Sequence, residues 1–96
     1  MSMDIDELRQ EIDNINDKLL GLFERRMEIS KEIGRYKKER LLPVKDEERE
    51  RQVLRRMCEK AQPELAEYVK ALFLSLFEMS SNYQIAQNKC DSAGNG

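Results

Sequence analysis

The sequence contains no histidine and no tryptophan, and only two cysteines, two prolines and four glycines among its 96 residues. Without histidine, the chain lacks the side chain that most often exchanges protons near neutral pH. Cys58 and Cys90 match no metal-binding or redox spacing, which argues against a metal site and against covalent catalysis by a thiolate. Because glycine and proline are scarce and no run alternates between apolar and polar residues, the composition favours an all-α fold.

The sequence also lacks long apolar runs and an excess of charge of one sign. No stretch reaches the length of a membrane span and no secretory signal is recognisable, so we expect a cytoplasmic protein without membrane contact. Lys and Arg number 17 against 19 Asp and Glu, which gives a formal net charge of −2. A nucleic-acid-binding protein normally has a basic excess, so we expect no nucleic-acid partner.

Three helices are predicted within a single domain over residues 1–96. The first spans about residues 4–40 and ends ahead of Pro43, because the residue before a proline disfavours the helical conformation. The second spans about 46–62 with Asp46 as its N-cap, and the third spans about 64–86 with Pro63 at its start. Residues 88–96 lose the apolar pattern and are expected to form a flexible tail.

The first predicted helix carries an apolar row that one arginine interrupts. Its members recur at steps of three and four: Ile5, Leu8, Ile12, Ile15, Leu19, Leu22, then Arg26, then Ile29, Ile33 and Tyr36. This helix would be about 54 Å long, whereas a compact chain of this size is about 32 Å across. The two shorter helices cannot cover the whole row, so we expect a homodimer; a plain coiled coil is the simplest alternative form of that dimer.

Polar residues stand in the inward rows of all three predicted helices. These residues are Arg26, Lys37, Arg49, Glu50, Ser80 and Gln84. Arg26 and Lys37 share one face of the first helix and lie roughly 16 Å apart along it, enough to bracket a small molecule. Polar groups that converge inside an apolar bundle form a binding pocket. A structural ion pair with Glu50 is the alternative for Arg26, and Arg56 is interpreted as a solvated surface charge.

Arg9 cannot reach such a pocket along its own helix. It lies seventeen residues before Arg26, about 26 Å away along the axis and about 100° around it. If Arg9 acts at the pocket, it must come from the other chain of an antiparallel pair. Otherwise Arg9 is an ordinary surface charge.

The chain resembles the all-α class of chorismate mutase from about Leu8 to about Gln84. The matching stretches are 8–13 (LRQEID), 18–20 (KLL), 24–26 (ERR), 32–37 (EIGRYK), 43–46 (PVKD) and 49–50 (RE), followed by Ser80 and Gln84. Each stretch is weak by itself, and their order and spacing together carry the resemblance. It implies an intertwined antiparallel homodimer, a helical bundle that rearranges chorismate to prephenate without a cofactor, on the route to phenylalanine and tyrosine.

The resemblance also implies roles for individual residues. Arg9 of the partner chain and Arg26 would hold the two substrate carboxylates. Lys37 would contact a carboxylate and the ether oxygen, to which Gln84 would also donate. A concerted rearrangement of this kind needs a folded substrate conformer and stabilised charge where the carbon–oxygen bond breaks, and it needs no acid–base relay.

A second group completes the site that the resemblance implies. Glu50 and the backbone near Asp46 would receive the ring hydroxyl, and Arg49 and Ser80 would complete the polar lining. Two other functions stay open from the sequence. One is an isochorismate pyruvate-lyase, which is less favoured because Glu50 is present to meet a hydroxyl. The other is a non-catalytic helical module that regulates another enzyme of the shikimate pathway.

Overall fold

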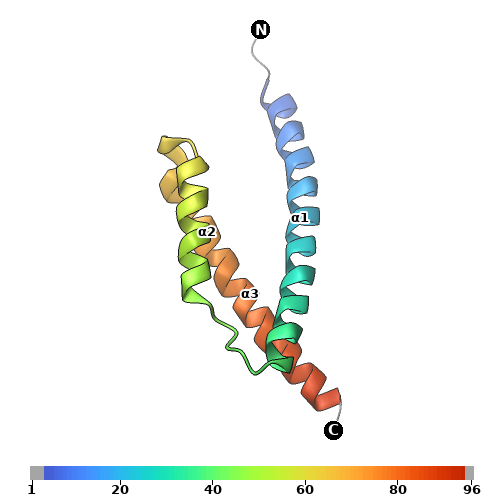
Figure 1. Ribbon diagram of the computed structural model, residues 1–96. Coiled ribbons are helices and arrows are strands. Elements are labelled where there is room, and N and C mark those ends of the chain that lie inside the picture. The colour runs from blue at the N-terminus through green and yellow to red at the C-terminus, as the bar shows by residue number, and fades with distance from the viewer. Residues whose placement is uncertain (1–3, 95–96) are drawn as a thin grey trace.

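The computed structural model describes the backbone of residues 4–94 and the side chains of residues 4–89, and all of its regular structure is helical (Figure 1). Helix α1 spans Ile5–Glu39, α2 spans Glu47–Lys60 and α3 spans Ala66–Gly94, with a 3-10 turn, η1, over Pro63–Leu65. The predicted all-α class is therefore confirmed for the part of the chain described. Within that part, no helix has both the length and the apolar character needed to span a membrane.

Capping side chains define the starts of α1 and α2. Asp4 Oδ1 accepts a hydrogen bond from the Glu7 backbone N–H at 2.8 Å, and Asp46 Oδ1 accepts one from Arg49 N–H at 3.1 Å. Acidic residues follow both caps within the first helical turn, where they interact favourably with the positive end of the helix dipole.

The end of α1 is built by a Schellman motif without glycine. The Leu42 N–H donates to the Lys37 carbonyl at 2.8 Å, and the Leu41 N–H donates to the Lys38 carbonyl at 3.2 Å. Leu41 has a φ of 55°, a left-handed conformation that costs a residue with a Cβ about 1–2 kcal/mol. The motif turns the chain out of α1 just ahead of Pro43 and leads it toward α2.

The C-terminal helix is longer than the sequence pattern predicts. The predicted end near residue 86 is wrong, because α3 continues to Gly94; residues 95–96 of the predicted tail lie outside the described residues. The apolar row fades after Tyr83, but no proline follows. Since propagation adds one backbone hydrogen bond for each residue, a helix can outlast its apolar face until a strong breaker stops it.

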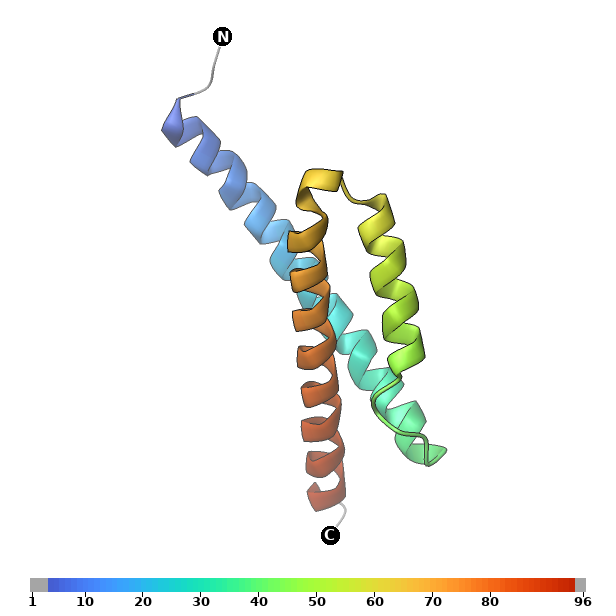
Figure 2. The same ribbon diagram turned by 90° about the vertical axis from the view of Figure 1, so that its left-hand side faces the viewer.

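Helix α3 is the centre of the molecule, because it packs against both α1 and α2. In Figure 2, α2 and α3 form an antiparallel hairpin, and α1 crosses α3 obliquely so that its N-terminal half projects away from the hairpin. The molecule measures 62 × 29 × 14 Å, with a radius of gyration of 17.4 Å against about 12.5 Å for a compact chain of this length. The protomer is therefore extended.

The protomer has almost no apolar core of its own. Among the described side chains, Phe77 is the only apolar one classed as buried, and Ser30 and Gln84 are the only polar ones. The apolar row on the first half of α1 keeps 43–72% of its surface exposed at Ile5, Leu8, Ile12, Ile15, Leu19 and Leu22. An extended apolar face of this kind is typical of an interaction surface.

Candidate functional site

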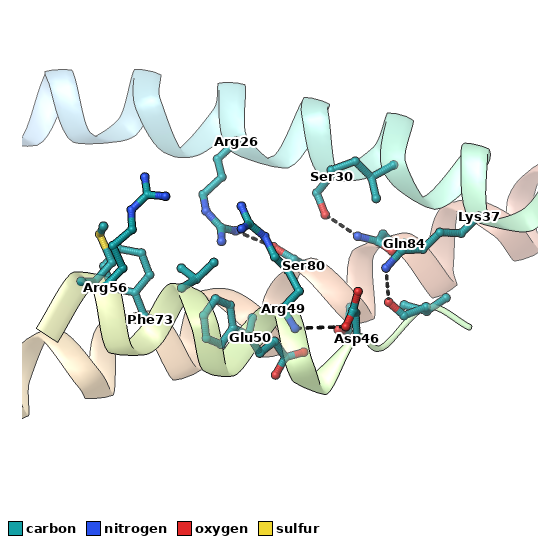
Figure 3. A pocket seen from close by; sticks show the side chains of 16 residues that line it. Arg26, Ser30, Lys37, Asp46, Arg49, Glu50, Arg56, Phe73, Ser80 and Gln84 are labelled. Carbon is teal, nitrogen blue, oxygen red and sulfur yellow. Dashed lines mark hydrogen bonds between the residues drawn. The ribbon is translucent and has the colours of Figure 1, made fainter. Parts of the chain in front are cut away.

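A cavity of about 570 Å³ lies between the second half of α1, the 40–46 connection, α2 and α3 (Figure 3). Every predicted site residue except Arg9 lines it: Arg26, Lys37, Asp46, Arg49, Glu50, Ser80 and Gln84. Its floor is apolar, formed in part by Phe73 and Phe77, whose ring centroids lie 6.2 Å apart. The cavity thus combines an apolar base with polar groups from all three helices, a combination typical of small-molecule sites.

Arg26 links α1 to α3 across the cavity. Its Nη1 donates to Ser80 Oγ at 2.7 Å, so the hydroxyl orients one edge of the guanidinium (Figure 3). The alternative of an ion pair with Glu50 is wrong, because the ion pairs of the described residues all join neighbours on a single helix or at its end. The carboxylate of Glu50 instead points away from α1 (Figure 3). Arg26 therefore keeps donors for an anion in the cavity.

Lys37 fixes the connection that closes one end of the cavity. Its Nζ donates to the Val44 carbonyl oxygen at 2.6 Å, which ties the last turns of α1 to the segment ahead of α2. An ammonium group has three donors, so the contact with Val44 leaves two for a ligand. Asp46, which caps α2, stands at the same end.

Gln84 is the most buried of the predicted site residues, with 7% of its surface exposed. Its Nε2 donates to Ser30 Oγ on α1 at 2.8 Å, and its Oε1 is buried without a hydrogen-bond partner. Sequence reasoning missed Ser30. The signal was present, because Ser30 lies four residues after Arg26 and seven before Lys37, on the same face of the helix.

Arg56 is a second lining residue that the sequence did not reveal. Its side chain is exposed, as interpreted, but it also lines the cavity and, with Arg49, reaches from α2 toward Arg26 (Figure 3). Arg56 is therefore exposed as predicted, and its place in the lining is an additional finding. The lining holds four cations, Arg26, Lys37, Arg49 and Arg56. It holds only two carboxylates, those of Asp46 and Glu50. The surplus of positive charge suits a ligand with more than one negative charge.

Arg9 lies outside this cavity, on the exposed first half of α1. It is about 26 Å from Arg26 along the helix, so it does not contribute to the site of its own protomer. Its predicted action across a dimer stays a prediction. Within the described residues, no group of three or more histidine, cysteine, aspartate or glutamate side chains is placed to hold a metal ion.

The arrangement can bind anions and stabilise developing negative charge. Its donors come from rigid helices and converge on one space, so they need little reorganisation when charge appears on a bound molecule. The lining holds no cysteine and no histidine. Two of its serines already accept hydrogen bonds, Ser80 from Arg26 and Ser30 from Gln84. The site is therefore suited to electrostatic catalysis more than to nucleophilic attack.

Comparison with known proteins finds similarity to a family model, to a solved structure and to a curated protein. The sequence model of the family described as chorismate mutase type II matches residues 8–85. Among solved structures, a conserved hypothetical protein from Pyrococcus furiosus is similar at a TM-score of 0.71 and 36% identity, covering 88% of this chain and 99% of that chain. A 3-dehydroquinate dehydratase from Pyrobaculum aerophilum is 43% identical over 49 residues, which is 51% of this chain but only 16% of that protein.

Proposed function

Because the chain belongs to the chorismate mutase type II family, we propose that it rearranges chorismate to prephenate, in the cytoplasm and without a cofactor. The observation that carries the proposal is the convergence of Arg26, Lys37 and Gln84 on one cavity with a cationic surplus. Chorismate carries two carboxylates, an ether oxygen and a ring hydroxyl. Each of these groups has a chemically suitable partner in the lining.

The carboxylates are met by cations at separate places. Arg26 is pre-oriented by Ser80, so its planar donors can engage one carboxylate in a fixed direction. Lys37 stands at the other end of the cavity, and Arg49 adds charge from α2. Two anchors of this kind favour the folded conformer in which the two carbons that will bond approach each other.

The chemical step needs stabilisation of the oxygen that gains electron density. As the carbon–oxygen bond of the ether breaks and the new carbon–carbon bond forms, Lys37 and Gln84 donate to that oxygen. One donor aimed at developing charge contributes about 2.7–4 kcal/mol, so two supply about 5–8 kcal/mol. Enzymatic accelerations begin at about 8 kcal/mol, and selection of the reactive conformer supplies the remainder.

The ring hydroxyl is assigned to the α2 end of the cavity. Asp46 and Glu50 are acceptors there, and the backbone that Asp46 caps adds further polar groups. The Glu50 carboxylate points away from α1, so binding includes a turn of this side chain toward the substrate. A change of rotamer on this scale is common when a ligand binds.

The active form is proposed to be an antiparallel homodimer with intertwined α1 helices. The exposed apolar row on the first half of α1 supports this, since residues such as Ile12 and Leu19 have more than half of their surface free in the protomer. In an antiparallel pair, the first half of one α1 passes the cavity of the other chain. Arg9 of the partner then completes the site with a further cation.

The purified protein tests this function directly. Incubated with chorismate, it should remove the ultraviolet absorbance of that substrate and produce prephenate, while a sample denatured beforehand should not. Formation of salicylate from isochorismate, without prephenate from chorismate, would identify a pyruvate-lyase and contradict the proposal.

A non-catalytic module is the second candidate, and the match to the dehydratase is what favours it. That protein is named for another reaction, and this chain spans less than a fifth of its length. A segment of similar sequence therefore occurs within a larger protein. If neither chorismate nor isochorismate is converted, while the chain changes the activity of a separately purified 3-dehydroquinate dehydratase, the module is the correct function.

A further inference from the structure

We propose that Ser30 is a positioning residue, which holds the amide of Gln84 in the orientation that the reaction needs. This inference rests on the proposed function, because it concerns the donor assigned to the ether oxygen. Ser30 and Gln84 are the two buried polar side chains of the described part of the chain, with 5% and 7% of their surface exposed. They contact each other between α1 and α3, at the wall of the cavity.

The contact uses one hydrogen of the amide nitrogen and leaves the second hydrogen for a ligand. Gln84 Nε2 donates to Ser30 Oγ at 2.8 Å, which uses one of its two hydrogens. The second hydrogen points in a different direction, about 120° away. Gln84 Oε1 is buried and has no partner, so the protein alone leaves part of this amide unsatisfied.

The aliphatic part of Gln84 packs where Gly34 has no side chain. A Cβ built on Gly34 would stand 2.8 Å from Gln84 Cγ and 3.0 Å from Gln84 Cβ. Gly34 follows Ser30 by one helical turn, so both residues lie on the same face of α1. Gly34 thus gives room for the aliphatic part of Gln84, while Ser30 fixes its polar end.

A fixed amide matters because the last torsion of glutamine is weakly restrained. This torsion has a broad, roughly two-fold distribution, so an amide without a partner presents its oxygen about as often as its nitrogen. Only the nitrogen can donate to the ether oxygen. Ser30 acts through Gln84 and does not itself reach the reacting atoms, so we expect it to affect kcat more than KM.

A double-mutant cycle tests this role, with Ser30→Ala, Gln84→Ala, the double variant and the original chain assayed on chorismate. We expect Ser30→Ala to lower kcat by about 3- to 10-fold and to change KM by less than about 2-fold. Gln84→Ala should lower kcat by about 100-fold or more. In the Gln84→Ala background, Ser30→Ala should have no further effect, because the group that it positions is absent.

Ser75→Ala is the matched control, since Ser75 is an exposed serine on α3 outside the cavity. It should keep the original kcat. If circular dichroism shows that Gln84→Ala is unfolded, Gln84→Met is used in its place. Methionine fills a similar volume but has no hydrogen-bond donor. An unchanged kcat for Ser30→Ala, or losses that multiply in the double variant, would overturn this inference alone. An original chain that does not convert chorismate would overturn the proposed function and this inference with it.

Discussion

Residues 5–22 and residues 26–37 belong to one continuous helix, α1, yet they differ in polarity and in what covers them. The first stretch carries an apolar row that is exposed to solvent throughout. The second stretch packs on α3 and carries Arg26, Ser30 and Lys37 in the continuation of the same face. In a self-sufficient protomer, the apolar half would be the covered one.

The comparison indicates that the apolar half of α1 lacks a covering surface, whereas the polar half lacks a ligand. The apolar half needs another apolar surface, which a second copy of the chain supplies in the proposed dimer. The polar half surrounds a cavity with surplus positive charge, which a substrate with two carboxylates would balance. The proposed dimer would meet both requirements, because it would bring the first half of one α1 to the cavity of the other chain.

The largest effect is expected from a charge placed in the apolar half. Ile12→Asp would put an unpaired carboxylate into the proposed interface twice in each dimer, at a cost of several kcal/mol. We expect the variant to sediment as a monomer and to lose at least about 100-fold of the chorismate mutase activity. Analytical ultracentrifugation and the chorismate assay measure both changes.

Asn14→Asp is the control for that variant. It adds the same charge two residues away, on the opposite side of α1 from Ile12. It should leave the sedimentation and the activity unchanged. A dimeric, active Ile12→Asp protein would show that the apolar half is not the interface.

The second effect concerns the polar half. Lys37→Ala removes a donor from the cavity, and we expect kcat to fall by about 100- to 1,000-fold. Lys38→Ala removes the neighbouring ammonium, which donates to the Asn88 carbonyl on the exposed side of the helix, and kcat should not fall. Steady-state kinetics on both variants separate a role in the cavity from general positive charge. Equal losses for the two lysines would contradict the assignment.

A smaller effect, on the free energy of unfolding, is expected when the glycine in each half of α1 is replaced by alanine. Nothing lies within 4 Å of a Cβ built on Gly21, so Gly21→Ala should raise the free energy of unfolding by about 0.5–1 kcal/mol through helix propensity. A Cβ at Gly34 meets the stem of Gln84, so Gly34→Ala should lower the free energy of unfolding by about 1–3 kcal/mol. Urea unfolding measures both values. Stabilisation by both alanines would mean that Gly34 is not needed for the contact between α1 and α3.

The smallest effect lies on α2, outside both halves. Arg51 Nη2 donates to Glu48 Oε2 at 2.7 Å and holds the pKa of that carboxyl below its usual value. Arg51→Ala should therefore raise the pKa of Glu48, without a change in kcat. A carboxyl whose pKa is lower in the folded than in the unfolded chain stabilises the fold at pH values above the unfolded-state pKa. This contribution is lost as the pH falls through the folded-state pKa. Titration of Glu48 by nuclear magnetic resonance checks the shift, and an unchanged pKa would show that the pair does not form in solution.

The sequence predicted the family and the helical class well, because both rest on local patterns. The family is confirmed by the match over residues 8–85, which includes Arg9 and Gln84. The start of α2 followed from the capping preference of Asp46, a property of a few neighbouring residues. The end of α3 was not predictable from its apolar row, because the helix outlasts that row.

Part of the candidate site depends on packing that no local pattern reveals. Ser30 and Gly34 are small residues within a helix, and their importance becomes apparent only when Gln84, 54 residues after Ser30, lies against them. Arg56 was missed for a related reason. A long exposed arginine on α2 lines the cavity only because α1 lies on the opposite side of that cavity (Figure 3).

The central claim is that one cavity is completed by two chains, and mixed dimers with two different tags test it most directly. A purified dimer of an Arg9→Ala chain and a Lys37→Ala chain contains one intact shared site, so it should have about half of the original activity. A dimer of the original chain and a chain with both substitutions contains no intact shared site and should be nearly inactive. The reverse pattern, activity in the second dimer and none in the first, would contradict the account, because each site would then belong to a single chain.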